Sequence, residues 1–331
     1  MHKIIRISKL ILFPTLGILI LYILFKDRNF DEIANSLKYD FNYWWIGISL
    51  IFGIFSHLVR AVRWQMLIAT EGKKPRLINT FGAVLTGYLA NLILPRMGEV
   101  SKCGVISKYE HVSFVRIAGT VIIERLADLI GMLTLLALVF LLEFDLIVTL
   151  VHQTLTIPTI PQLLTSYAFW GIIVLAILLA YIAYRFIKKS FLMKLENLWV
   201  KFKDGIQSFN KLNNKPLFIL LSAAIWFFYF MMLYVTFFAM EATSHLSPTA
   251  GLTILITGSL GMLAPIQGGM GAWHFMVIQS LVLYGVSEDV AGNFALVVHS
   301  SQNILVIALG LISFILLPLF NTKKPTHPIV L

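Results

Sequence analysis

Charged residues are scarce in this chain, and long apolar runs are abundant. Only 13% of the 331 residues are charged, 58% are hydrophobic, and the mean hydropathy is +0.85. A soluble domain usually carries about 25% charged residues. This composition excludes an ordinary soluble protein and predicts an all-α polytopic membrane protein, with room for about six to eight spans.

Cysteine and catalytic motifs are scarce as well. The single cysteine, Cys103, excludes an internal disulfide and a cysteine-based metal cluster. The sequence contains no nucleotide P-loop, no dinucleotide-binding glycine fingerprint after a strand and no HExxH zinc motif. We therefore expect no cofactor and no metal, and we identify no catalytic residues that would make the chain an enzyme.

The formal net charge of +10 is spread unevenly. In a membrane protein such charge reports orientation and contact with anionic lipid, so we expect membrane lipids and not nucleic acid as partners. Lys3, Arg6 and Lys9 precede an apolar run at 10–25 that resembles a signal peptide. No small-residue cleavage site follows, which favours an uncleaved first span.

Six apolar segments are long enough to cross a bilayer of about 30 Å. Two further apolar stretches, 77–94 and 250–264, end at a Pro-x-x-Gly break, and short segments at 98–107 and 271–285 follow them. We interpret both pairs as re-entrant helical hairpins. The six predicted spans are 9–25, 43–62, 118–142, 166–187, 217–240 and 293–319.

The two breaks are the most informative feature of the sequence. They begin at Pro95 and Pro265 and end at Gly98 and Gly268. Proline removes a backbone donor and disrupts the preceding turn, and hydrocarbon cannot satisfy the freed groups. Paired interruptions at corresponding places in two halves indicate a binding site in transporter-like proteins. Alternatively, both prolines are ordinary loop residues between short helices.

Loop charges favour the re-entrant interpretation. With re-entrant hairpins and both termini in the cytoplasm, every inside segment is net positive and every outside segment net negative. The triplets at about 43–142 and 217–319 then form an inverted-topology repeat within a single membrane domain, 1–331. Such repeats are typical of translocating proteins.

Three charged residues interrupt the apolar segment 118–142. Glu124 and Asp128 are four residues apart on one helix face, and Arg125 is one step round. Charges at that depth are costly unless they are paired or hydrated, so they are candidates for function. Alternatively, they form ion pairs that lock this helix to Arg96 or Lys102 of the first hairpin.

Each break supplies further candidate substrate-binding residues. Arg96 suits a bidentate grip on a phosphate, and Lys102 acts as a point charge. Glycines at the second break allow close backbone approach, and the following helix N-terminus attracts anions. His274 is either a hydrogen-bonded helix residue or a proton carrier, and the polar band around His299 faces the cavity or joins helices. The full set is Asn91, Arg96, Glu99, Lys102, Glu124, Arg125, Asp128, Gln267, Gly268, Gly269, Gly271, His274, His299 and Asn303.

Two other features suggest contact with the membrane surface. The segment 188–215 alternates lysines with aromatic and aliphatic residues, which predicts an amphipathic helix on the anionic cytoplasmic leaflet. His57, Arg60 and Trp64 share a face near the cytoplasmic end of the second span. We interpret these three side chains as interfacial anchors.

Taken in order, these motifs resemble the lysylphosphatidylglycerol synthase transmembrane-domain family, whose members are also described as flippase-like. The matching motifs are Asn91-x-x-x-Pro95-Arg96-x-Gly98-Glu99, Glu124-Arg125-x-x-Asp128 and Pro265-x-x-Gly268-Gly269-x-Gly271. Family members often carry a glutamate where this chain has His274. In the synthases this unit is fused to a soluble aminoacyl-transfer domain. Because only a short tail precedes Leu331 here, we do not expect this chain to aminoacylate lipid.

The resemblance implies movement of a lipid between leaflets. We expect a translocase for a phospholipid or lipid-linked precursor, anionic or zwitterionic, in the inner membrane of a prokaryote, with acyl tails left in the bilayer. The alternatives are a membrane-embedded lipid-modifying enzyme or its accessory subunit, and a small-solute transporter. Assembly into a homo-oligomer is compatible with all three functions.

Overall fold

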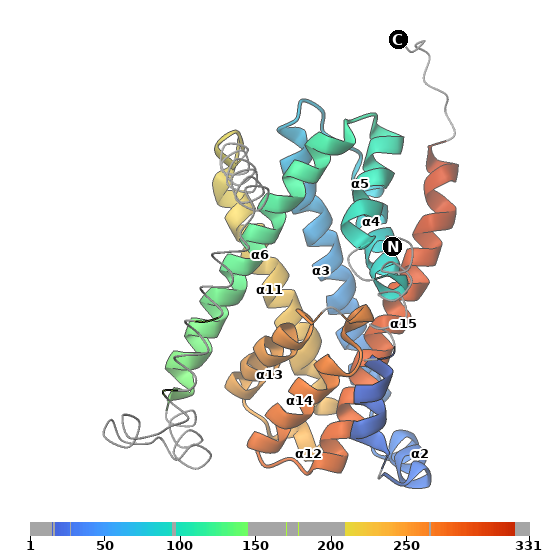
Figure 1. Cartoon of the computed structure of the whole chain (residues 1–331), viewed down its shortest axis with the longest axis vertical. Helices are drawn as coiled ribbons and strands as arrows, with labels where there is room; N and C mark the ends of the chain where they lie inside the picture. The colour runs from blue at the N-terminus through green and yellow to red at the C-terminus, as the bar shows by residue number, and fades with distance from the viewer. Residues whose placement is uncertain are drawn as a thin grey trace.

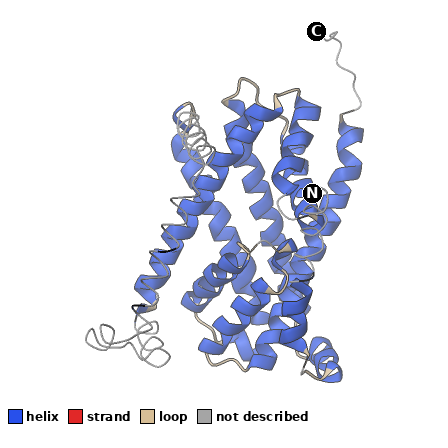
Figure 2. Cartoon of the chain, in the orientation of Figure 1, coloured by secondary structure: helices blue, strands red, loops and turns tan. Residues whose placement is uncertain are grey.

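The computed structural model describes residues 15, 17–26, 28–94, 97–144, 170, 178, 209–264 and 266–321. Within these residues every regular element is a helix and no strand occurs (Figure 2). Residues 9–14 and 16 of the predicted span 9–25, most of the span 166–187 and most of the basic segment 188–215 lie outside this part of the chain. So do three residues at the breaks, Pro95, Arg96 and Pro265.

Four described helices are long and apolar enough to cross a membrane. The last of them, α15 (Glu288–Phe320), rises about 1.5 Å per residue and is longer than the roughly 30 Å hydrocarbon layer. Asn42 precedes the helix that begins at Tyr43, and Asn214 precedes the helix that begins at Lys215. Each asparagine caps its helix by accepting a hydrogen bond from a backbone N–H group of the first turn. The four are α3 (Tyr43–Ala69), α6 (Phe114–Leu142), α11 (Lys215–Tyr234, extended by the 3₁₀ turn η1, Val235–Ala239) and α15 (Glu288–Phe320).

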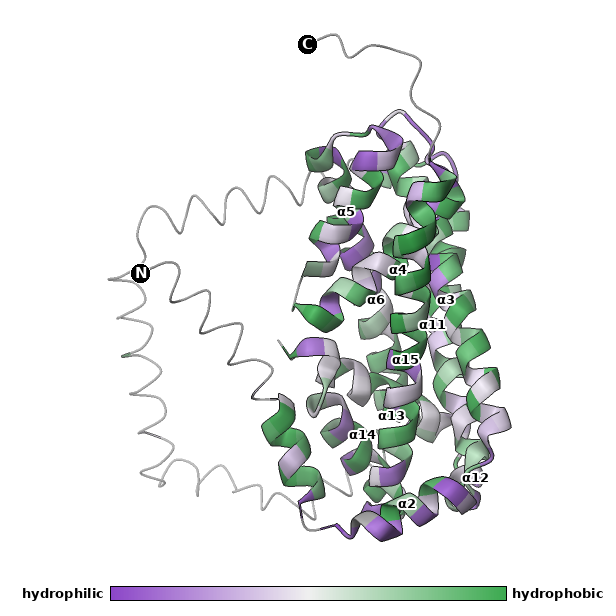
Figure 3. Cartoon of the chain, turned by 90° about the vertical axis from the view of Figure 1, so that its right-hand side faces the viewer, coloured by the Kyte–Doolittle hydropathy of each residue, from purple (hydrophilic) through white to green (hydrophobic). Residues whose placement is uncertain are grey.

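The outer surface of these helices suits a lipid environment. Large apolar side chains such as Leu141 on α6, Leu220 on α11 and Phe314 on α15 are each more than 60% exposed. A protein in water rarely exposes so much contiguous apolar surface. Figure 3 shows hydrophobic colour along the long helices and hydrophilic colour over α2 (Phe30–Tyr39) at the lower end. The described structure is therefore that of an integral membrane protein.

Four shorter helices form two antiparallel pairs. Helix α4 (Leu77–Ile93) packs on α5 (Met97–Glu110), and α13 (Pro248–Gly261) packs on α14 (Ala272–Leu283). The first pair occupies the upper half of the molecule and the second pair the lower half (Figure 1). These helices lie where the sequence predicts the two hairpins.

Glycine permits close contact inside each pair. A Cβ added to Gly98 would lie 2.5 Å from the carbonyl oxygen of Gly87 across the α4–α5 contact. A Cβ on Gly261 would lie 2.8 Å from the carbonyl oxygen of Ala272 across the α13–α14 contact. Real Cβ contacts are longer than this, so both helix pairs depend on glycine for their spacing.

The tips of the two pairs touch each other near the middle of the molecule. The Gln267 Nε2 donates a 3.2 Å hydrogen bond to the Ile93 carbonyl at the end of α4. Gly268, in the short 3₁₀ turn η2 (Gln267–Gly269), has a φ of 57° and lies against Leu92. The two breaks, more than 160 residues apart in sequence, therefore meet in space.

Candidate functional site

A cluster of buried ion pairs joins α3, α5 and α6 beside the first helix pair. The Arg60 Nη1 on α3 lies 2.9 Å from the Glu124 Oε1 and 2.7 Å from the Asp128 Oδ2, both on α6. The Glu124 side chain is 1% exposed. One arginine thus bridges two carboxylates that the four-residue spacing places on the same helix face.

Two further cations complete the buried part of this cluster. The Arg63 Nη2 donates to the Asp128 Oδ1 at 2.6 Å, one turn of α3 beyond Arg60. The Lys102 Nζ on α5 donates to the Glu124 Oε2 at 2.5 Å. Lys102 also lies over the Trp64 ring, with 4.5 Å between the nitrogen and the ring centroid. Every carboxylate oxygen of Glu124 and Asp128 therefore has a cationic partner.

A half-exposed ion pair lies at the edge of the cluster. The Arg125 Nη2 on α6 donates to the Glu99 Oε1 on α5 at 2.5 Å. With this pair the cluster holds four cations and three carboxylates, which gives a formal charge of 4 − 3 = +1. The Nε atoms of Arg60 and Arg63 are buried and lack hydrogen-bond partners. The cluster therefore has spare positive charge and unused donors.

The space inside this cluster is small. A polar cavity of about 20 Å³ lies among Arg60, Tyr88, Asn91, Lys102 and Glu124. A cavity of roughly 10–15 Å³ already holds a water molecule, so this one accommodates a water and not a lipid headgroup. Asn91 closes one wall by accepting a 2.7 Å hydrogen bond from the Gly98 N–H. In this conformation the cluster is shut to large ligands.

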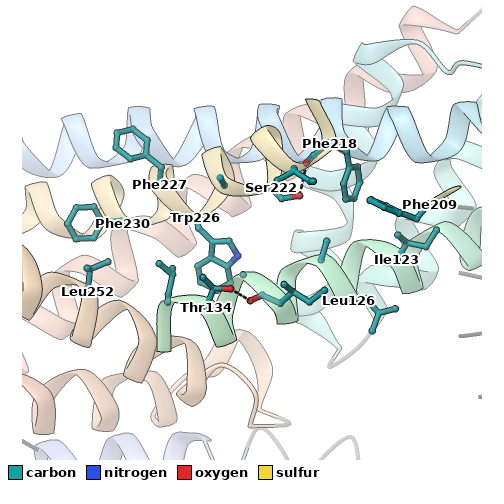
Figure 4. A pocket seen from close by; sticks show the side chains of 16 residues that line it. Ile123, Leu126, Thr134, Phe209, Phe218, Ser222, Trp226, Phe227, Phe230 and Leu252 are labelled. Atoms are coloured by element: carbon teal, nitrogen blue, oxygen red, sulfur yellow. Dashed lines mark hydrogen bonds between the residues drawn. The ribbon is translucent and has the colours of Figure 1, made fainter. Parts of the chain in front are cut away.

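A much larger apolar cleft adjoins the cluster. It lies between α6, α11 and α13, has a volume of about 1010 Å³, and is lined by side chains such as Leu126, Ile130 and Phe230 (Figure 4). Ser222 lines the cleft and also accepts a 3.1 Å hydrogen bond from the Arg63 Nη1. Phe218, which lines the same end, lies under the Arg63 guanidinium. Ser222 and Phe218 therefore contact both the cleft and the charged cluster.

The second break holds a pair of buried histidines. The Nδ1 atoms of His274 on α14 and His299 on α15 are 3.3 Å apart. The His299 Nε2 lies 2.9 Å from the Gly268 carbonyl oxygen, so this nitrogen carries the proton. Trp273 stacks on the His299 ring with 4.7 Å between centroids. The contact between His299 and Gly268 joins η2 to α15.

The other predicted residues of the second break surround this pair. Gln267 contacts the first helix pair, as described above, and Asn303 lies near Gly268. Gly269 and Gly271 have φ of 68° and 82°, in the left-handed region that glycine adopts readily. A side chain at Gly271 would also collide with Ile20. The glycines at this break are therefore explained by backbone conformation and packing.

The structure thus gathers the predicted residues into two groups. Glu99, Lys102, Glu124, Arg125 and Asp128 belong to the cluster and Asn91 lines its cavity, whereas the residues of the second break form the histidine group. The predicted ion pair between Glu124 and Lys102 is present. The prediction for Arg96 lies outside the described residues.

The interpretation of three α3 side chains as interfacial anchors is wrong, and two arginines of the site were therefore missed. His57, Arg60 and Trp64 are buried inside the protein and do not anchor it to the membrane surface. Arg60 is the centre of the cluster, and its neighbour Arg63 is fully buried. The available signal was the spacing, since two arginines three residues apart on an apolar helix share a buried face.

Fold and site together define a polytopic α-helical membrane protein with a buried polar centre. The chain belongs to the lysylphosphatidylglycerol synthase TM region family, whose model matches residues 7–310. It is 27% identical over 216 residues to a UPF0104 membrane protein of Methanocaldococcus jannaschii, covering 64% of this chain and 85% of that protein. A UPF0104 membrane protein of Methanothermobacter thermautotrophicus is 28% identical over 125 residues, 36% of this chain and 37% of that protein. No solved structure matches the chain.

Proposed function

We propose that this protein is a lipid translocase that moves a charged headgroup between the leaflets of a prokaryotic cytoplasmic membrane. The observation that carries this proposal is the buried cluster of four cations and three carboxylates beside an apolar cleft. A charged headgroup needs polar partners inside the bilayer, whereas hydrocarbon chains need an apolar surface. Membership of a family named for a lipid-modifying synthase supports a lipid-related role.

Two re-entrant hairpins provide the proposed pathway. In this proposal α4–α5 enters from the cytoplasm and α13–α14 from the opposite side, as an inverted repeat. Contact between their tips at Gln267 and Ile93 supports this arrangement, because opposed hairpins meet near the midplane. The small cavity at the cluster corresponds to a closed state. Transport then requires the hairpin tips to separate, which admits the headgroup to the cations.

Transport, and not chemistry on the lipid, is the proposed role. The acidic and basic side chains of the cluster satisfy one another in ion pairs. The hydroxyl groups of Ser222 and Tyr229 accept hydrogen bonds from Arg63 and Arg60, and within the described part of the chain neither is paired with a carboxylate that could act as its base. If the lipid composition of a deletion strain changed while leaflet distribution did not, the protein would instead act as a lipid-modifying enzyme or its accessory subunit.

Reconstitution tests the proposal directly. The purified protein is placed in liposomes with fluorescent anionic, zwitterionic and neutral lipids, and leaflet exchange is measured by quenching from outside. We expect faster exchange of at least one charged lipid than in empty liposomes. Exchange no faster than in empty liposomes, for every headgroup tried, would refute the proposal.

A pair of lysines on the same helix supplies the matched variants. Lys102→Gln removes a buried cluster cation, whereas Lys108→Gln changes an exposed lysine on α5. We expect Lys102→Gln to slow exchange of anionic lipid several-fold and Lys108→Gln to leave it unchanged. Size-exclusion profiles of both variants establish that each is folded before exchange is compared.

A further inference from the structure

The cleft between α6, α11 and α13 is far larger than the polar cavity. We propose that this cleft binds the hydrocarbon chains of an anionic phospholipid while its headgroup is handled at the cluster. This inference rests on the proposed function and differs from the expectation that the acyl tails stay in the bilayer. It assigns a binding site for the apolar part of the substrate, with α6 contributing to both sites.

The size and lining of the cleft fit hydrocarbon. Its volume of about 1010 Å³ is at the upper end of the range of roughly 300–1,000 Å³ typical of small-molecule pockets. Nearly all of its lining side chains are aliphatic or aromatic, and they include Leu126, Ile130, Phe227 and Leu252. Such a surface offers an extended chain dispersion contacts and few hydrogen bonds.

The polar groups of the cleft suit an amphiphile rather than a wholly apolar ligand. Ser222 connects the cleft to Arg63, which belongs to a cluster of formal charge +1. The Trp226 Nε1 is buried at the cleft without a hydrogen-bond partner, although a buried indole N–H usually has one (Figure 4). This nitrogen packs against Gly131 of α6, so Ser222 remains the polar group that joins the cleft to the cluster.

The charge of the cluster favours a lipid over a segment of this chain as the occupant of the cleft. The predicted span 166–187 is apolar but carries one formal charge, the cation Arg185, and only Trp170 and Leu178 of it are among the described residues. A cation added beside a net positive cluster is repelled, whereas one lipid phosphate brings the total to zero. Charge complementarity therefore favours a singly anionic phospholipid over this segment.

Photo-crosslinking in liposomes tests the assignment. Phosphatidylglycerol with a diazirine in one acyl chain is activated, and labelled residues are mapped by mass spectrometry. We expect labels on Leu126, Ile130 and Phe227 that unlabelled phosphatidylglycerol displaces several-fold better than diacylglycerol does. Equal labelling of lipid-facing Leu133 and Leu220, outside the cleft, would overturn the assignment.

Two alanine variants provide a matched comparison. Ala223→Phe adds bulk inside the cleft, and Ala137→Phe adds the same bulk on α6 at an exposed position outside it. We expect Ala223→Phe to reduce cleft labelling several-fold and Ala137→Phe to leave it unchanged. A disulfide formed efficiently between Ile130→Cys and Leu178→Cys would show that segment 166–187 fills the cleft and would refute the proposal.

The same liposomes separate this inference from the proposed function. Leaflet exchange is measured before activation of the probe. Exchange without specific labels in the cleft contradicts only the cleft assignment and leaves the translocase proposal intact. Specific labels without exchange contradict the translocase proposal and leave a lipid-binding cleft.

Discussion

At the scale of residues, each buried charge of the ion cluster depends on its partners. Burial of an ion costs several kcal/mol, and an uncompensated partner left behind typically costs 3–5 kcal/mol. Asp128 is the clearest case, because it is paired with both Arg60 and Arg63. Its removal would leave two buried guanidinium groups with too little negative charge.

We therefore expect Asp128→Asn to destabilise the protein by about 3–5 kcal/mol. Glu99→Gln is the control, because it breaks a pair with the half-exposed Arg125 and should cost at most about 1 kcal/mol. Unfolding of both variants in the same detergent, measured by thermal melting, checks the difference. Equal losses would show that the cluster charges are hydrated and not effectively buried.

Five of the seven charged residues of this cluster are among the candidates named from the sequence, and only Arg60 and Arg63 are not. Glu124, Arg125 and Asp128 interrupt a strongly apolar helix, so their hydropathy marks them as functional candidates. Arg60 and Arg63 lie toward the end of α3, where cations are expected at the membrane surface. Only the fold shows that α6 and α5 cover that face, because no local pattern encodes which helices pack together.

At the scale of elements, the two helix pairs depend on glycine. Gly98 begins the return helix of the first pair, and its N–H is held by Asn91. A methyl group at this position would lie 2.5 Å from the Gly87 oxygen and 2.4 Å from the Asn91 Nδ2. Gly104, on the same helix, has nothing within 4 Å of an added Cβ.

This contrast gives a prediction with an internal control. We expect Gly98→Ala to destabilise the protein by about 1–3 kcal/mol, because overpacking forces α4 and α5 apart. Gly104→Ala should be neutral or stabilising, since alanine favours helix by about 1 kcal/mol over glycine. Melting temperatures in detergent decide between these outcomes. Identical effects at both positions would contradict the close approach of the two helices.

Most described helices lie near their predicted ranges, and the differences have a physical cause. The second span was expected to end at 62, but α3 continues to Ala69. Polar residues there ended the apolar run in the sequence, yet Arg63 and Gln65 are hydrogen-bonded inside the protein. A hydropathy pattern shows which residues are polar but not whether their side chains are hydrogen-bonded inside the protein. It therefore predicts too early an end for a helix whose polar side chains are buried and paired.

At the scale of the whole molecule, the question is how the two helix pairs lie relative to the bilayer. If both pairs are re-entrant, residue 108 at the end of the first faces the cytoplasm and residue 288 after the second faces outside. If α4 crossed the membrane completely, the cations following α5 would lie outside, against the positive-inside bias. The two topologies therefore place residue 108 on opposite sides.

The single cysteine makes this a clean experiment. Cys103 is buried and Cys103→Ser gives a cysteine-free background, into which Lys108→Cys and Glu288→Cys are introduced separately. In intact cells we expect a membrane-impermeant maleimide to label residue 288 but not residue 108 until the membrane is opened. Cys103→Ser alone controls for background labelling. Labelling of residue 108 from outside would rule out the inverted repeat, because both pairs could not then enter from opposite faces and meet at Gln267 and Ile93.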